Sequence, residues 1–232
     1  MNDIEAHLIV RDPAAQLAKL RTEWGSQHDL WVFGYASLIW RPEFDAAEHR
    51  PALVRGWHRA LRKRSRVNRG TPQQPGLVFA LMPGGACRGM VYRLRREDAD
   101  GELERLWARE MPTGVYDPRL LACRTPQGEV PALAFTLSRR SESYMGHLAD
   151  EQLLHILRHA RGRYGTTLDY VALTAHALRE HGVRDREIER LMRLAAHHGL
   201  VQAPPARKAS RSATVSTSTS TPGSSTSAAK AG

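Results

Sequence analysis

The chain has 232 residues, a net charge of +10 at pH 7 and two cysteines. Cys87 and Cys123 lie far apart and form no CxxC motif, which favours reduced thiols in a cytoplasmic protein over a disulfide-bonded secreted domain. The polar N-terminus does not resemble a signal peptide, and no segment reaches the roughly eighteen consecutive apolar residues of a membrane helix. We therefore expect neither secretion nor membrane insertion.

The positive charge raises nucleic acid or an acidic membrane surface as partners, but its arrangement argues against both. The densest basic run, residues 59–69, alternates with apolar residues such as Leu61 and Val67, as on the solvated face of a strand. No zinc-ligand spacing, helix-turn-helix signature or aromatic RNA-binding motif accompanies it. We expect no specific nucleic-acid partner and interpret the basic surface as one that attracts small acidic substrates.

Composition divides the chain into three regions. Residues 1–29 predict an N-terminal helical extension, and residues 30–202 predict one folded domain. Residues 203–232 are rich in Ser, Thr, Ala and Pro and predict a disordered tail. The tail holds four basic residues and no acid, which leaves a net charge of +6 on residues 1–202.

The first predicted element is a helix that begins at Asp12 and Pro13, where a capping side chain and a proline precede apolar residues at helical spacing. A buried strand follows over residues 30–35. Residues 52–65 alternate imperfectly around Gly56, which predicts a long strand with a bulge or bend.

Two apolar runs follow, over residues 77–82 and 87–94, and Pro83-Gly84-Gly85 between them predicts a hairpin. Residues 97–111 have the pattern of an amphipathic helix, ended by Pro112.

Strands are expected again over residues 116–124 and 130–137, and helices over about 149–160, 167–181 and 185–198. This order, in which strands with one embedded helix are followed by a helical C-terminal part, predicts an α+β fold. We expect a curved sheet or small mixed β-barrel with flanking helices, and not a doubly wound sheet.

Residues 32–40 run from an apolar strand into a turn of small residues with one hydroxyl. Backbone N–H groups at such a strand end can bind a carboxylate or a developing oxyanion, and Ser37 adds a side-chain donor. An ordinary buried strand followed by a loop is the alternative. The segment lacks the second glycine of a GxSxG motif, so Ser37 is predicted to bind and not to act as a nucleophile.

Glu110 lies in the last turn of the helix over residues 97–111, between apolar Trp107 and Met111, where the helix dipole disfavours an acid. Such a glutamate is a candidate for a raised pKa and for general base catalysis. A solvated glutamate at a helix end is the alternative. His155 and His159 have metal-ligand spacing but lack a third ligand, so no metal site is predicted.

Five fragments occur in the order and spacing of the ChaC-like γ-glutamylcyclotransferases, and the chain resembles that family over about residues 30–198. Any one fragment is weak evidence, but five in register are hard to obtain by chance. The fragments are residues 33–42, 55–59, 69–78, 109–111 and 114–116.

The resemblance implies the γ-glutamylcyclotransferase fold and the cleavage of glutathione to 5-oxoproline and cysteinylglycine, without a cofactor. The family's catalytic glutamate corresponds to Glu110. Its Tyr-Gly-Ser-Leu turn, which cradles the γ-glutamyl group, corresponds to Tyr35, Ala36, Ser37 and Leu38.

The same resemblance implies that four further residues contact the substrate. Tyr116 and Tyr144 would form walls of the pocket, and Arg64 or Arg69 would meet the glycine carboxylate of glutathione.

Ala36 departs from the family's glycine, and Asn68 stands where a histidine often precedes Arg-Gly-Thr. If position 36 needs a positive φ, alanine would cost on the order of 1 kcal/mol; if φ is negative, the change is harmless. Two alternatives stay open: the same cyclisation on other γ-glutamyl amides or dipeptides, and a non-catalytic basic binding protein on the same fold.

Overall fold

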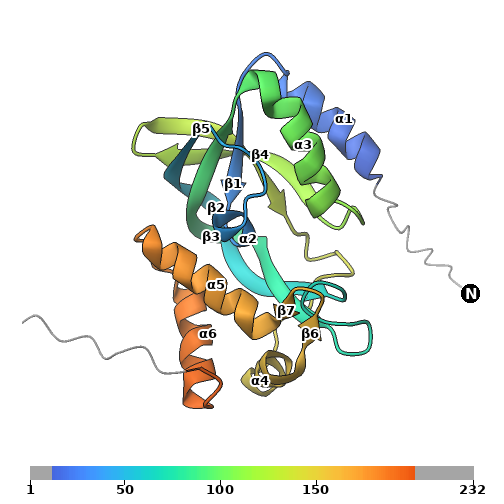
Figure 1. The fold of residues 1–232 in the computed structure, drawn as a ribbon, viewed down its shortest axis with the longest axis vertical. Helices are drawn as coiled ribbons and strands as arrows, with labels where there is room; N and C mark the ends of the chain where they lie inside the picture. Colours follow the sequence, from blue (N-terminus) through green and yellow to red (C-terminus); the bar gives the residue numbers. More distant parts are fainter. Residues whose placement is uncertain (1–11, 202–232) are drawn as a thin grey trace, which may run out of the picture.

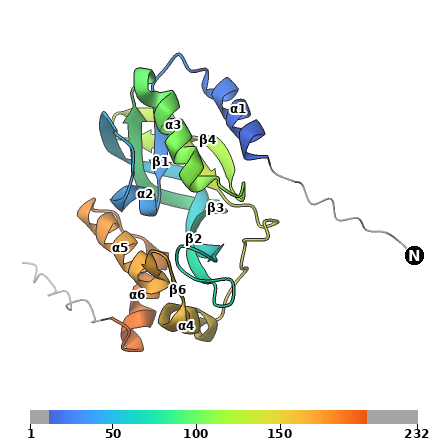
Figure 2. The ribbon, with the colours of Figure 1, turned by 45° about the vertical axis from the view of Figure 1, so that its right-hand side comes forward.

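Five strands close into a β-barrel at one end of the molecule (Figures 1 and 2) in the computed structural model, which describes residues 12–201. The barrel closes because β5 pairs in parallel with β1, where Trp31 lies opposite Ala132, while the other long ladders are antiparallel. The predicted α+β class with a small mixed barrel is confirmed. In order around the barrel the strands are β1 (Leu30–Gly34), β3 (Gly76–Leu94), β2 (Glu48–Ser65), β4 (Asp117–Thr125) and β5 (Gly128–Thr136).

Large apolar side chains fill the interior of the barrel. Phe33, Phe79 and Phe135 are each at most 2% exposed, on strands in which buried residues form the inner face. The ring of Phe135 also contacts Trp107 and Tyr116, at 6.0 and 6.1 Å between centroids. This aromatic contact joins the barrel core to the helix that carries Glu110.

The predicted hairpin at Pro83-Gly84-Gly85 is wrong. β3 runs unbroken for 19 residues and pairs with β2 on both sides of these residues. Gly84 and Gly85 have φ values of 103° and 73°, and opposite them Gly56 of β2 has φ 79° at a register shift, as predicted. Glycines in both strands therefore bend the ribbon without reversing the chain.

Two helices, α1 (Pro13–Trp24) and α3 (Arg96–Glu110), lie side by side along one flank of the barrel (Figures 1 and 2). They are held together by Arg21, whose guanidinium lies 2.7 Å from both Asp100 and Glu104. α3 begins and ends one residue before the predicted bounds, so its last residue is the candidate glutamate.

The C-terminal helices pack at the other end of the barrel (Figure 1). The short helix α2 (Ser37–Trp40) follows β1 and contacts α5, where Trp40 Nε1 donates a hydrogen bond to Thr174 Oγ1 at 3.2 Å. Among residues 12–201, no helix is both long and apolar enough to cross a bilayer. The predicted tail over residues 203–232 lies outside the described residues. The C-terminal elements are α4 (Asp150–His159), β6 (Arg161–Gly162), β7 (Gly165–Thr166), α5 (Thr167–Glu180) and α6 (Arg186–His197).

A buried ion pair joins the barrel to these helices. The Arg59 side chain of β2 is 0% exposed, and its Nη1 donates to Asp185, which caps α6 by accepting a bond from Ile188 N at 3.0 Å. The same guanidinium donates to the carbonyl oxygens of Tyr35 and Arg88. The residue that follows β1 is therefore tied to the C-terminal helices through one arginine.

Replacing Asp185 by Ala should lower the free energy of unfolding by about 3 kcal/mol, because it leaves the Arg59 charge buried without its carboxylate. Urea denaturation measures this loss. Asp150→Ala is the control, because Asp150 and its partner Arg190 are 58% and 38% exposed and such a pair is worth at most about 1 kcal/mol. Equal losses in the two variants would contradict a structural role for the buried pair.

Candidate active site

A cleft of about 450 Å³ is lined by the end of β2, the C-terminus of α3, α2 and α5. A smaller pocket adjoins it, and the two share Ser37, Glu110, Tyr116 and Tyr170. The strand-end turn and the glutamate, more than seventy residues apart in the chain, therefore lie in one continuous hollow. The predicted site residues that line one or both pockets are Tyr35, Ala36, Ser37, Leu38, Arg69, Glu110 and Tyr116.

The turn after β1 has the form of a donor site. The carbonyl oxygens of Ala36 and Ser37 accept bonds from Ile39 N at 2.9 Å and Arg41 N at 2.8 Å, which starts α2. Within residues 12–201, no acceptor is found for the N–H groups of Ser37 and Leu38. Both N–H groups are therefore available to an anionic group in the pocket.

Alanine fits at position 36 without a left-handed backbone. Ala36 has φ −148° and is 4% exposed, so the penalty that a positive φ would impose on it does not arise. The departure from the family's glycine therefore imposes no left-handed strain on the turn.

Arg109 connects the turn to the glutamate. Its Nη1 donates to the carbonyl oxygen of Arg41 at 2.6 Å and to the Glu43 carboxylate at 2.9 Å, and its Nη2 donates to Ser37 Oγ at 3.3 Å. Its Nε lies 3.1 Å from Glu110 Oε1. One guanidinium therefore fixes the spacing between the hydroxyl and the carboxylate.

Burial raises the pKa of Glu110 above its ordinary value of 4.5, although Arg109 and Lys63 act in the opposite direction and Glu43 adds to the rise. The side chain is 16% exposed and lines both pockets. A raised pKa agrees with the expectation from sequence. Its main cause is desolvation.

The tyrosines of the pocket are neutral phenols. Tyr35 Oη donates to the carbonyl oxygen of Phe135 at 2.9 Å, and the phenols of Tyr35 and Tyr116 are close enough for each to shift the pKa of the other. Burial is the main cause that raises the pKa of Tyr35, Tyr116 and Tyr170 well above the ordinary value of 10.0, and the charge of Glu110 adds to the rise in all three. Glu110 is therefore the acid in this pocket that is suited to lose and regain a proton near neutral pH.

Arg69 lies at the far wall of the cleft and is 6% exposed. Its Nη1 donates to the carbonyl oxygens of Tyr164 and Thr166, and its guanidinium lies 5.3 Å from the ring centroid of Tyr170. The other N–H groups of this guanidinium have no acceptor within residues 12–201, while the backbone N–H donates to Ser65 Oγ at 3.0 Å. Arg69 is thus placed where an anionic group entering the cleft would meet it.

Arg64 and Tyr144 do not line the cleft. Arg64 Nε donates to Met145 Sδ at 2.8 Å, and the residue that lines the cleft is its neighbour Lys63. Tyr144 forms a backbone bridge with Lys63 and its N–H donates to the carbonyl oxygen of Ser141 at 2.9 Å. A bulge between Leu61 and Lys63 resets the alternation of β2, and no residue in the sequence marks it.

Sequence analysis also missed Arg109 and Tyr170 as site residues. Arg109 adjoins Glu110 in one of the five fragments, and this adjacency was a usable signal. Tyr170 lies on α5 without any distinguishing neighbour, and only the packing of α5 on the barrel brings it into the pocket.

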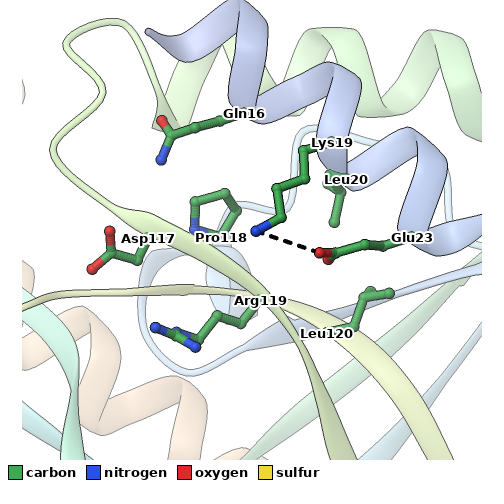
Figure 3. Close-up of a pocket in the computed structure, with 8 residues that line it drawn as sticks. All are labelled: Gln16, Lys19, Leu20, Glu23, Asp117, Pro118, Arg119 and Leu120. Atoms are coloured by element: carbon green, nitrogen blue, oxygen red, sulfur yellow. Dashed lines mark ion pairs between the residues drawn. The ribbon is translucent and has the colours of Figure 1, made fainter. Parts of the chain in front are cut away.

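A separate hollow of about 320 Å³ lies between α1 and β4 (Figure 3). An ion pair between Lys19 and Glu23, 3.7 Å long, borders it, and it contains none of the predicted site residues. Gln16 on its rim donates to the carbonyl oxygen of Tyr116 at 3.5 Å. The chemical groups described above all lie in the other cleft.

Known proteins resemble this chain over most of its length. A family model described as "ChaC-like protein" matches residues 30–198. A glutathione-specific gamma-glutamylcyclotransferase of Escherichia coli (strain K12) is 33% identical over 180 residues, covering 77% of this chain and 78% of that protein. The glutathione-specific gamma-glutamylcyclotransferase 1 of Mus musculus is 29% identical over 187 residues, covering 78% and 84%. A crystal structure of a yeast gamma-glutamyl cyclotransferase specific to glutathione superposes with a TM-score of 0.68 at 19% identity, covering 74% of this chain and 97% of that one.

Replacing Ala36 by Gly should lower the free energy of unfolding by about 0.5–1 kcal/mol, because φ is negative and glycine adds only freedom to the unfolded chain. Denaturation in urea measures the sign of this change in the free energy of unfolding. Gly56→Ala is the matched reverse change: φ is 79° there with open space around it, so alanine should also destabilise, by about 1–2 kcal/mol. Stabilisation by Ala36→Gly would show that the turn prefers glycine after all.

Proposed function

The chain belongs to the ChaC-like protein family, and we propose that it is a γ-glutamylcyclotransferase that cleaves glutathione to 5-oxoproline and cysteinylglycine. The proposal rests chiefly on one observation: a buried glutamate with a raised pKa shares a pocket with the N–H groups of the turn after β1. A base and a set of donors in one pocket are what an intramolecular acyl transfer needs.

The reaction closes a ring and requires neither a nucleophile from the protein nor water. The α-amine of the γ-glutamyl group attacks its own γ-carbonyl, a lactam C–N bond forms, and the amide bond to cysteine breaks. The amine is an ammonium near neutral pH, so it must first lose a proton. Glu110 accepts this proton, and then a second one from the same nitrogen as the lactam forms, and passes each to the departing nitrogen, which leaves as the ammonium group of cysteinylglycine.

The pocket favours the folded conformation of the substrate. Because attack is intramolecular, the gain comes from holding amine and carbonyl in contact. The N–H groups of Ser37 and Leu38 and the Ser37 hydroxyl donate to oxygen atoms of the γ-glutamyl group, and Tyr116 packs beside it. Arg109 keeps Ser37 and Glu110 at a constant spacing while charge moves between substrate and protein.

The cytoplasm is the compartment that we propose for this activity. Cys87 and Cys123 are both free and buried, which fits a reducing environment in which glutathione keeps thiols reduced.

Incubation of the purified protein with glutathione should release 5-oxoproline and cysteinylglycine in equal amounts, as followed by mass spectrometry. A panel of γ-glutamyl amines and dipeptides tests whether the leaving group matters, since glutathione should react fastest if Arg69 binds its glycine carboxylate. Folded protein that forms neither product from glutathione would refute the proposed function.

Replacing Glu110 by Gln should lower kcat by about a hundred- to ten-thousandfold, the usual contribution of a general acid and base. The free energy of unfolding should not fall. A raised pKa in the folded state means that the protonated form is favoured there, so wild-type stability falls as pH rises through that pKa, and Gln imitates the protonated form.

Glu104→Gln is the control, because Glu104 lies on the same helix and is 62% exposed. This control should keep its turnover within about twofold, as expected of a surface change. Wild-type turnover in the Glu110→Gln enzyme would remove Glu110 from the mechanism.

A further inference from the structure

Four cationic side chains line the cleft, and three of them are engaged by acceptors of the protein. Arg41 pairs with Glu43, Arg109 binds two carbonyl oxygens and two carboxylates, and Arg69 binds the carbonyl oxygens of Tyr164 and Thr166. Lys63 is the exception. Within residues 12–201, its Nζ has no hydrogen-bond acceptor and no carboxylate within 4.0 Å.

Lys63 is also partly buried. Its Nζ lies 5.0 Å from the centroid of the Tyr116 ring, and burial lowers the pKa of the amine, against the opposing effect of Glu110. A partly desolvated ammonium without an acceptor has a cost for a folded protein. An anion supplied by the substrate offsets that cost, because it provides the missing acceptor in the same low-dielectric space.

The position of Lys63 indicates which of the two carboxylates of glutathione it can bind. The α-carboxylate is attached to the same carbon as the α-amine, which Glu110 must reach. Lys63 and Glu110 are close enough to shift each other's pKa, and both line the cleft beside Tyr116. The glycine carboxylate lies at the opposite end of the tripeptide, where Arg69 is available.

We propose that Lys63 binds the α-carboxylate of the γ-glutamyl group and so orients the α-amine toward Glu110. This inference rests on the proposed function and assigns the donors of the site. With the α-carboxylate at Lys63, the N–H groups of Ser37 and Leu38 serve the oxygen of the γ-carbonyl, on which negative charge develops during ring closure.

Substrate binding then changes the basicity of Glu110. In the free site the Lys63 charge lowers the pKa of Glu110, together with Arg109. Once the α-carboxylate neutralises Lys63, that effect weakens and the Glu110 carboxylate holds a proton more strongly. The substrate thus strengthens the base that it needs.

The test compares Lys63→Met with Arg64→Met, which removes the same charge one residue away and outside the cleft. Three substrates are used: glutathione, its glycine ethyl ester, and 4-aminobutyryl-cysteinylglycine, which lacks the α-carboxylate and cyclises to 2-pyrrolidinone. With glutathione, Lys63→Met should lower kcat/KM by about ten- to a hundredfold, the value of a hydrogen bond between charged groups. Arg64→Met should change it less than about twofold.

The substrate comparison identifies the carboxylate. Lys63→Met should lower kcat/KM for the ethyl ester as much as for glutathione, and should have little effect on the analogue without the α-carboxylate. Lys63→Arg should recover part of the loss. If the variant instead loses its discrimination between glutathione and the ester, Lys63 binds the glycine end and the inference is overturned.

The pH dependence of kcat/KM distinguishes binding by Lys63 from a merely structural role, which would leave that dependence unchanged. The charged and titratable groups around Glu110 are Arg109, Lys63, Glu43 and the phenols of Tyr35, Tyr116 and Tyr170. Removing the Lys63 charge raises the pKa of Glu110, so the acidic limb of kcat/KM should move to higher pH in Lys63→Met and stay in place in Arg64→Met. An unmoved limb with unchanged kcat/KM would exclude Lys63 from the site.

Product binding separates this inference from the proposed function. By calorimetry, 5-oxoproline should bind the wild type more tightly than 2-pyrrolidinone, and Lys63→Met should lose that difference. If the wild type fails to cleave glutathione, the proposed function alone is refuted. If 5-oxoproline binds the wild type and the Lys63→Met variant equally well, the role of Lys63 is refuted.

Discussion

The guanidinium of Arg109 is the contact on which the geometry of the site depends. It joins the last turn of α3 to the turn after β1, and its N–H donors are shared among two backbone carbonyls, two carboxylates and one hydroxyl. Because guanidinium is planar and always charged, these partners hold fixed directions at any working pH. Glu110 can then change its protonation state without a change in the position of Ser37.

Burial determines the chemistry of the residues held in this way. Burial raises the pKa of the carboxyl group and the phenols and lowers the pKa of the lysine. The uncharged forms of Glu110 and Lys63 are therefore more favoured here than they would be on a surface. Among the described residues the charge of Lys63 has no counter-ion because, in our proposal, the α-carboxylate of the substrate supplies it. Elsewhere a buried charge, Arg59, is given its carboxylate by the protein itself.

Much of the fold could be predicted from local patterns, and the failures have a common cause. The Gly56 bulge, the helix that ends at Glu110 and the three C-terminal helices follow from composition and periodicity. Pro83-Gly84-Gly85 was mistaken for a reversal because a glycine pair that bends a strand and one that closes a hairpin look alike locally, and only the partner strand distinguishes them. The same limit explains why sequence analysis placed Arg64 at the pocket although Lys63 is the neighbour that lines the cleft, since the bulge after Leu61 exists only in the pairing of β2 with β3. Glu110 and the turn could be found because each combines unusual residues within a few positions, whereas Tyr170 enters the pocket only through tertiary packing.

The tie between Arg59 and Asp185 has a consequence for when the protein becomes active during synthesis. The turn after β1 leaves the ribosome early, but its anchoring arginine gains a counter-charge only when residue 185 has emerged, and β1 must also wait for β5, roughly a hundred residues later. A nascent or prematurely terminated chain therefore lacks the ordered pocket, and activity arises only once the molecule is nearly whole. Long-range closure of this kind makes assembly of the catalytic pocket a late event, coupled to the completion of the domain.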